Sequence, residues 1–296
     1  MKSTENLLKV IGLAICLLFS LMPSYPQVLE LTVIGIVLMT VGIPHGAIDH
    51  LTSKPNPSSK DLIFFLIRYL GMIGIYILLW ILFPLLSLAF FLLFSAYHFG
   101  QSHFFERKNL IFTDYFLYLT RGSFFISVIL LGDLEMTQSI LNPLIDFQGI
   151  VPYAFYAMGI FLIVSLVLEW KSYRLIKKST WVDLVFLAPL LFISPLMISF
   201  IVYFGFWHAF PSMKLEYQFL KAFPPYNSIK KFIYQLLPFS LISLIGIGLM
   251  VYFGQQYLES SELLLLFFIL ISLISFPHVI YMDRFVRIIK TDRYST

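Results

Sequence analysis

The sequence predicts an all-α fold, a polytopic bundle of about ten transmembrane helices (eight to ten) with both termini in the cytoplasm. Three observations support this prediction. Hydrophobic residues make up 59% of the 296 residues and charged residues 12%, whereas a soluble domain carries about 25% charged residues. Apolar runs follow one another along the chain, and Lys and Arg gather in alternate connections between these runs. A bilayer accommodates this much apolar surface, whereas a soluble core of this size does not.

Most of the apolar runs approach the ~20 residues that cross the hydrocarbon layer as a helix. Pro84 and Pro195 interrupt two long runs, and because proline breaks the helical hydrogen-bond ladder, we expect a tight turn at each. The run 181–193 is the shortest. In chain order, the predicted helices occupy roughly 7–23, 28–51, 62–83, 84–104, 113–131, 150–168, 181–193, 195–213, 232–253 and 262–281.

The positive charges support this assignment of spans. With ten spans, all but two of the 20 Lys and Arg residues fall on the side of the N-terminus, and the opposite side has none. The two exceptions, Arg68 and Arg121, lie within about two turns of that same side. Because cytoplasmic loops carry the excess of Lys and Arg, we predict that this side is cytoplasmic. The expected location is the inner (plasma) membrane, with multiple crossings.

The chain is expected to form one integral-membrane domain over residues 1–296, because no soluble insert separates the apolar runs. Its net charge is +4. No block of Lys and Arg resembles a nucleic-acid-binding segment, so a nucleic-acid partner is not expected.

All six histidines fall near the cytoplasmic ends of four predicted helices, the second, fourth, eighth and tenth. Ionisable groups inside a membrane are costly and tend to mark functional sites. Neutral imidazole is a common ligand of iron, copper and zinc. We therefore predict a shared redox-metal site rather than six separate buried histidines. The candidate ligands are His45, His50, His98, His103, His208 and His278.

The residues beside these histidines refine the prediction. Gly46 and Gly100 permit a bend or a close backbone approach. A spacing of five turns the second side chain by about 140° on a regular helix. His50 and His103 therefore reach a metal shared with His45 and His98 only if the helix bends; otherwise they lie outside the ligand set.

Two kinds of acidic residue have different expected roles. Asp49 follows His45 by four residues and is either an acceptor for the ring N–H of a ligand histidine or a charge at the end of a helix. Glu106 and Glu216 are expected to be solvated loop charges.

Four segments together resemble the Brp/Blh family of bacterial and archaeal β-carotene 15,15′-dioxygenases, over roughly residues 40 to 285. The first two segments are specific, and the last two are short. They are Gly42-Ile43-Pro44-His45-Gly46-Ala47-Ile48-Asp49-His50, Tyr97-His98-Phe99-Gly100-Gln101-Ser102-His103, Phe206-Trp207-His208-Ala209 and Phe276-Pro277-His278-Val279. The resemblance implies a membrane enzyme that uses Fe(II) and O2 to cleave β-carotene into two retinals. It also implies a functional link to a microbial rhodopsin.

The resemblance also assigns iron ligands. His45, His98 and His208 match family ligands, whereas Ser212 stands where the family has a fourth histidine. His103 stands where the family commonly has an acidic residue. One hypothesis is that His103 supplies the missing imidazole; His278, which matches a recurrent Pro-His of the family, is the alternative fourth ligand.

Other classes of protein fit the histidines less well. A carrier of two haems places histidine pairs at two depths, and a membrane desaturase or hydroxylase has His-x-x-x-His and His-x-x-His-His boxes; neither pattern is present. A transporter predicts midplane ionisable groups and inverted repeats, which are not evident. An opsin needs a lysine within a helix, and no lysine lies mid-helix.

Overall fold

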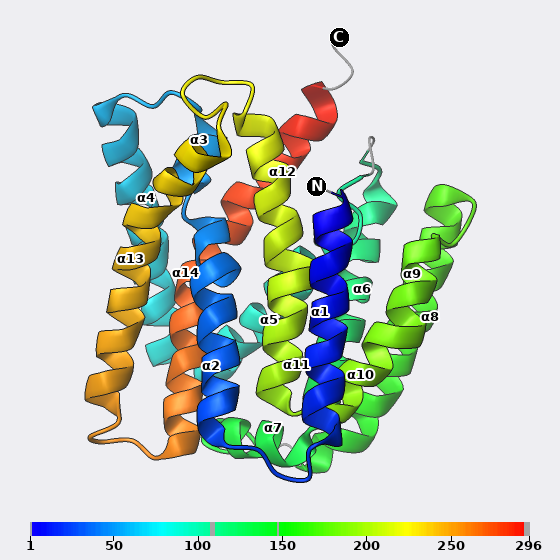
Figure 1. Ribbon diagram of the computed structural model, residues 1–296. Helices are drawn as coiled ribbons and strands as arrows, with labels where there is room; N and C mark the ends of the chain where they lie inside the picture. Colours follow the sequence, from blue (N-terminus) through cyan, green and yellow to red (C-terminus); the bar gives the residue numbers. More distant parts are fainter. Residues whose placement is uncertain (1, 107–109, 147, 293–296) are drawn as a thin grey trace. The chain divides into compact units, whose positions relative to one another are not determined.

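Every regular element in the described part of the chain is a helix (Figure 1). The computed structural model describes residues 2–106, 110–146 and 148–292, and the all-α class is confirmed over these ranges. The chain divides into two compact units, unit 1 with Met1–Gly42 and Ser95–Pro211, and unit 2 with Ile43–Phe94 and Ser212–Thr296. The single domain 1–296 stays a prediction.

Nine helical stretches in the described residues have the length and composition of membrane spans, and each overlaps one predicted run. They are Ser3–Leu21, Gln27–Ser53, Ser59–Leu82, Pro84–Ser102, Phe112–Gly132, Gln148–Tyr173, Leu196–Leu220, Ile229–Gly254 and Ser260–Lys290. So many long apolar helices indicate a membrane protein.

The remaining predicted run, 181–193, differs from the others. It lies in three short helices, α9 (Lys178–Val182), η4 (Asp183–Leu187) and α10 (Ala188–Ile193). Their sixteen residues would rise only about 24 Å as an α-helix, less than the ~30 Å of the hydrocarbon layer. The count of candidate spans in the described chain is therefore nine rather than ten, within the expected range.

Both predicted proline turns are present. Helix α4 (Ser59–Leu82) ends two residues before α5 (Pro84–Ser102) begins, and α10 is followed by α11 (Leu196–Val202) after Ser194 and Pro195. Proline is suited to the start of a helix because its missing N–H has no partner there.

Unit 1 contains close backbone contacts between the second half of α5 and α6 (Phe112–Gly132). A Cβ atom on Gly100 would lie 1.8 Å from the Tyr118 carbonyl oxygen, and one on Gly122 would lie 1.7 Å from that of Ala96. Only glycine allows this approach, which is typical of membrane helix pairs. Besides α9, η4, α10 and α11, this unit also contains α1 (Lys2–Leu21), α2 (Gln27–Val37), η1 (Leu38–Gly42), α7 (Leu134–Leu141), η3 (Gln148–Ile150), α8 (Val151–Tyr173) and η5 (Tyr203–Ala209).

A buried ion pair joins α6 to α8. The Arg121 guanidinium donates to the Glu169 carboxylate over 2.7 Å, and both side chains are fully buried. Thr180 Oγ1 also donates to Glu169, over 2.9 Å. Buried charges are tolerated when their partners satisfy them. Arg121 thus faces the interior of unit 1.

Unit 2 contains η2 (Pro44–Gly46), α3 (Asp49–Ser53), α4, α13 (Ile229–Gly254), α14 (Ser260–Asp292) and most of α12 (Phe210–Leu220). Trp80 Nε1 donates to Ser272 Oγ over 3.0 Å and links α4 to α14. Ser58 and Asp61 form a capping box at the start of α4. One apolar core of this unit comprises Ile48, Leu51, Leu220, Tyr226, Phe232 and Leu236.

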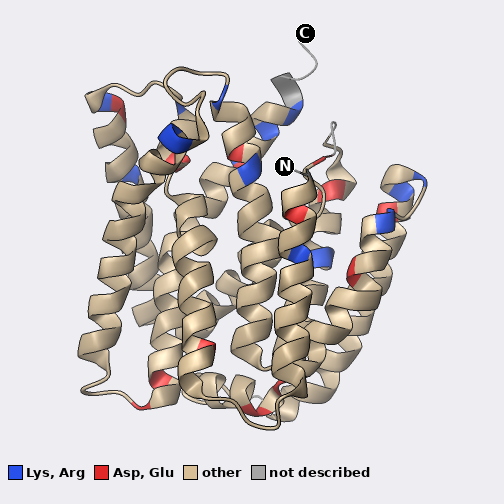
Figure 2. Cartoon of the chain, in the orientation of Figure 1, with Lys and Arg blue, Asp and Glu red and all other residues tan. Residues whose placement is uncertain are grey.

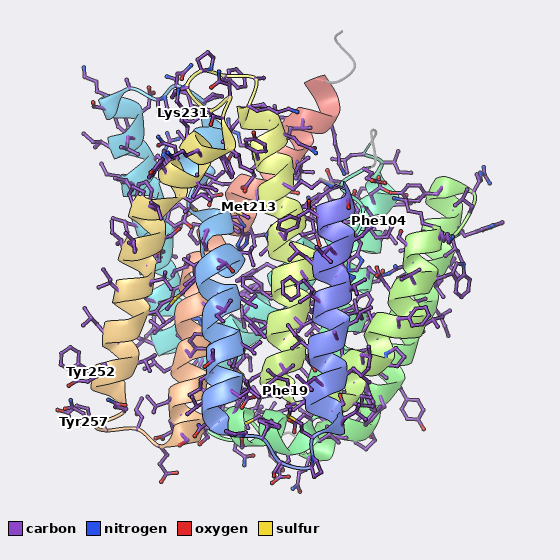
Figure 3. The ribbon with its side chains drawn as sticks, in the orientation of Figure 1. Phe19, Phe104, Met213, Lys231, Tyr252 and Tyr257 are labelled. Atoms are coloured by element: carbon purple, nitrogen blue, oxygen red, sulfur yellow. The ribbon has the colours of Figure 1, made fainter. Side chains whose placement is uncertain are left out.

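The lysines of α13 lie at one end of the helix, whereas its aromatic residues lie along its length (Figure 2). Lys231 lies near its first residues and Tyr252 near its last, and Tyr257, which is 83% exposed, lies three residues beyond the end of the helix (Figure 3). Tyrosines are enriched at membrane–water interfaces, and lysines are enriched in cytoplasmic loops. Lys231 and Tyr252 thus lie where a membrane-spanning α13 would meet the two membrane–water interfaces.

Candidate metal centre

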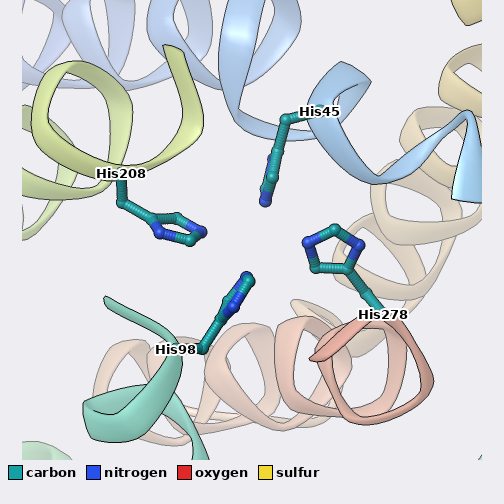
Figure 4. A group of neighbouring side chains, drawn as sticks. All are labelled: His45, His98, His208 and His278. Atoms are coloured by element: carbon teal, nitrogen blue, oxygen red, sulfur yellow. The ribbon is translucent and has the colours of Figure 1, made fainter. Parts of the chain in front are cut away.

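Four of the six histidines form one buried group. Each offers one ring nitrogen, and these four atoms all lie within 4.8 Å of one another. Figure 4 shows the four rings directed at a common point. The side chains are 0–6% exposed, and they belong to His45, His98, His208 and His278.

His98 and His208 both lie in unit 1, and their ring centroids are 4.3 Å apart. His98 lies on α5 next to Phe99, two residues before the close contact made by Gly100. His208 lies in η5, a seven-residue π-helix. π-helical turns are rare and frequently occur at functional sites, because the extra residue per turn redirects the side chains.

His45 and His278 both lie in unit 2, and their ring centroids are 4.7 Å apart at an interplanar angle of 85°. His45 lies in the short 3₁₀ turn η2, where the regular helix is interrupted. A Cβ on Gly46 would lie 3.2 Å from Nδ1 of His278. Because Gly46 has no side chain, the His278 ring can approach the turn closely. This is the close approach to the backbone that was expected at Gly46.

Asp49 is buried and contacts His278. Each of its carboxylate oxygens is 3.0 Å from His278 Nδ1. If Asp49 is ionised, its carboxylate accepts a hydrogen bond from His278 Nδ1–H, and Nε2 then carries the lone pair of the ring. This contact has the geometry expected of an acceptor for a histidine ring N–H, and with 1% exposure Asp49 is not a solvated charge; its role toward a metal ligand stays a prediction.

The other two histidines lie outside the group. His50 packs against Phe65 and Phe239, with ring centroids 5.9 and 5.0 Å away. His103 contacts Asp183 and Tyr203 instead. Both are the second member of a pair spaced by five residues, and in each pair the structure brings the first member into the group and leaves the second outside it.

The group contains His278, and not His103, as its fourth histidine. Ser212 is fully buried. Burial lowers the pKa of His103, which favours its neutral ring. The partner of His103, Asp183, lies in the short run 181–193; sequence reasoning missed it, because no local motif marks it.

The two glutamates that were expected to be solvated loop charges differ in exposure. Glu216 is fully buried, so that expectation is wrong for it, whereas Glu106 is exposed as expected.

The donor set fits a single transition-metal ion. Two imidazole nitrogens on opposite sides of an ion, each at about 2.1 Å, are about 4.2 Å apart, and neighbouring ligands are closer. Four nitrogens within 4.8 Å match this size after small adjustments. Imidazole ligands suit zinc, copper, iron and nickel, so the geometry alone leaves the identity of the metal open.

The chain matches the family described as "Beta-carotene 15,15'-dioxygenase" over residues 36–285. A curated relative with the same name, from uncultured marine bacterium 66A03, is 26% identical over 259 residues, which are 83% of this chain and 90% of the relative. No solved structure matches the chain significantly. The matched range includes all four histidines of the group.

Proposed function

The chain belongs to the β-carotene 15,15′-dioxygenase family, and from this premise we propose that it uses O2 to cleave β-carotene at the central 15,15′ double bond, releasing two retinals. Membership in the family, together with the name of the curated relative, identifies the chain as an enzyme. The observation that carries the proposal is the buried four-histidine group inside the matched range.

The proposed cofactor is one ferrous ion held by His45, His98, His208 and His278. All four offer neutral imidazole nitrogens, which are suitable ligands for iron. When bound, the ion would supply the activation of O2, chemistry that protein side chains do not provide. The near-complete burial of the four rings keeps bulk water away from that site.

The surrounding side chains have two proposed tasks. Asp49 holds the proton on Nδ1 of His278 and thereby keeps the lone pair of Nε2 available to the ion. Phe99 and Phe204 lie beside His208, with ring centroids 4.6 and 5.8 Å from its ring. β-Carotene is a hydrocarbon without a charged group, so such apolar surfaces must select and orient it.

A membrane location suits this substrate, because β-carotene dissolves in the bilayer. We propose the inner membrane, with the Lys- and Arg-rich connections in the cytoplasm. Retinal released there would be available to a microbial rhodopsin. Family membership favours this reaction over the desaturase, haem-carrier and transport alternatives.

The proposal is tested in a bacterial host that accumulates β-carotene. Wild-type protein is expected to convert β-carotene to retinal, measured by chromatography, and to contain about one iron per chain, measured by elemental analysis. His45→Ala and His208→Ala are each expected to lower retinal at least about 100-fold, because a metal site that loses one ligand loses its affinity and geometry. An iron chelator should abolish the activity of the purified enzyme.

His50→Ala is the matched control, because His50 lies five residues from His45 and outside the group. This variant is expected to retain iron and to produce retinal. If folded, iron-loaded wild-type protein leaves β-carotene intact, the proposed reaction is wrong for this chain. If His50→Ala loses iron as completely as His45→Ala, the proposed ligand set is wrong.

A further inference from the structure

A buried chain of hydrogen bonds in unit 1 lies next to the histidine pair without belonging to it. Asp183 Oδ2 is 3.1 Å from His103 Nδ1, and His103 Nε2 is 3.0 Å from the Tyr203 hydroxyl. Trp207 Nε1 donates to Asp183 Oδ1 over 2.8 Å. These four side chains are all buried or nearly so: Tyr203 is fully buried, and the side chain of His103 is 5% exposed.

The donors and acceptors determine where the protons lie. The indole N–H of Trp207 can only donate, so Asp183 accepts from it. Asp183 as a carboxylate also accepts from His103, which places the ring proton on Nδ1. His103 Nε2 is then an acceptor, and the Tyr203 hydroxyl must donate to it. Each polar atom of the imidazole ring therefore has a partner, and the ring has one defined tautomer.

Both ends of this chain of bonds are attached to the π-helix η5. Tyr203 is its first residue and Trp207 its fifth, and His208 follows directly after Trp207. Ser102 Oγ, on the residue before His103, also donates to the Trp207 carbonyl oxygen over 3.0 Å. The His103 ring stacks on Phe125, with centroids 5.0 Å apart and planes 6° from parallel.

A π-helix needs such external support, because its hydrogen-bond geometry is less favourable than that of an α-helix and it persists only as short segments. Here the support comes from His103, which directly follows the helix that carries His98, and from Asp183 on η4. The contacts that fix η5 therefore also fix the position of His208 relative to His98.

We propose that His103, together with Asp183 and Tyr203, is a positioning residue of the metal centre. It holds η5 so that His208 faces His98, and it does not ligate the metal itself. This inference rests on the proposed function, because it assumes that the four-histidine group binds a metal.

The test measures the ferrous-ion affinity of the full-length protein in detergent, without O2, by competition with a chelator, together with the melting temperature of the metal-free protein. Tyr203→Phe removes one hydroxyl and leaves the ring. We expect it to weaken ferrous-ion binding about tenfold, since residues that orient metal ligands contribute about 10- to 100-fold in affinity. His103→Ala is expected to weaken ferrous-ion binding more than Tyr203→Phe does. His103→Asn is expected to weaken it less than His103→Ala, because the amide N–H of asparagine can replace Nδ1–H as the donor to Asp183.

Trp80→Phe is the control, since it removes a buried hydrogen bond of similar length in unit 2 and does not touch η5. It is expected to lower the melting temperature of the metal-free protein while leaving ferrous-ion affinity unchanged. Wild-type affinity in both Tyr203→Phe and His103→Ala would overturn the positioning role. If the wild-type protein itself binds no ferrous ion, the proposed metal centre fails, and the inference that rests on it fails with it.

Discussion

Asp49 shows how a single residue in a membrane-length helix acquires a role from its contacts. Its carboxylate is 1% exposed and within 3.0 Å of His278 Nδ1, although the two residues are separated by more than two hundred positions in the chain. An ionised group in such an apolar environment is costly unless it is paired. The proposed reaction uses this pair to direct Nε2 of His278 at the metal.

Asp49→Asn is expected to reduce the affinity for ferrous ion about 10-fold to 100-fold, or about 1.4 to 2.7 kcal/mol. The amide oxygen can still accept from His278 Nδ1, but without the negative charge that increases the basicity of the ring. The measurement is iron per chain after dialysis against a graded chelator. Thr52→Val is the control, because Thr52 Oγ1 donates only to the Asp49 main-chain oxygen. Equal iron retention in Asp49→Asn and wild type would contradict the role of Asp49.

At the scale of the elements, irregular helices position the site. His208 lies in the π-helix η5, and His45 lies in the 3₁₀ turn η2, which is separated from the π-helix η1 by one residue. The second half of α5, which carries His98, is held against α6 by two glycines with no room for a Cβ atom. The regular helices therefore form the frame, and the local departures from regularity direct the imidazole rings.

Gly122→Ala tests this close packing. The new Cβ would overlap the Ala96 carbonyl group, so α5 and α6 must separate, and we expect a loss of about 1–3 kcal/mol in stability together with lower iron occupancy. Thermal unfolding in detergent and elemental analysis measure these effects.

Gly159→Ala on α8 is the matched control, since nothing lies within 4 Å of its Cβ position. Alanine favours the helix there by up to about 1 kcal/mol, so this variant should be at least as stable as wild type. A Gly122→Ala protein that unfolds at the wild-type temperature would show that α5 and α6 do not depend on this contact.

At the scale of the whole molecule, the number of membrane crossings determines on which sides the two termini lie. The predicted location of both termini in the cytoplasm requires an even number of crossings, whereas nine stretches of the described chain have membrane-spanning length. The sixteen residues of α9, η4 and α10 must then form the tenth crossing. A local thinning of the bilayer can accommodate a short span at modest cost.

Reporter fusions at the two termini test this topology. Fusions of a cytoplasm-active fluorescent protein are expected to be active at both ends, and fusions of a periplasm-active phosphatase at both ends inactive. A fusion in the 142–150 connection, which has no Lys or Arg, is the control and should show the opposite pattern. Termini on opposite sides would mean that residues 178–193 do not cross.

Local sequence was sufficient to predict the helices, because membrane-spanning segments and their prolines depend on composition and on the backbone chemistry of a few neighbouring residues. The sequence also included all four histidines of the group among its six candidate ligands. Its motifs resemble the family that the chain matches. The convergence of the histidines near one depth was likewise visible from the order of the predicted helices.

The choice of four histidines among six depended on tertiary structure. On regular helices, spacing of five separates His45 from His50 and His98 from His103, but sequence alone does not say which member of each pair faces inward. The π-helices and the 3₁₀ turn change the direction of the side chains, and such turns leave no clear sequence pattern. The partners of the selected residues, Asp49 for His278 and Asp183 for His103, come from distant parts of the chain and meet only when the helices pack.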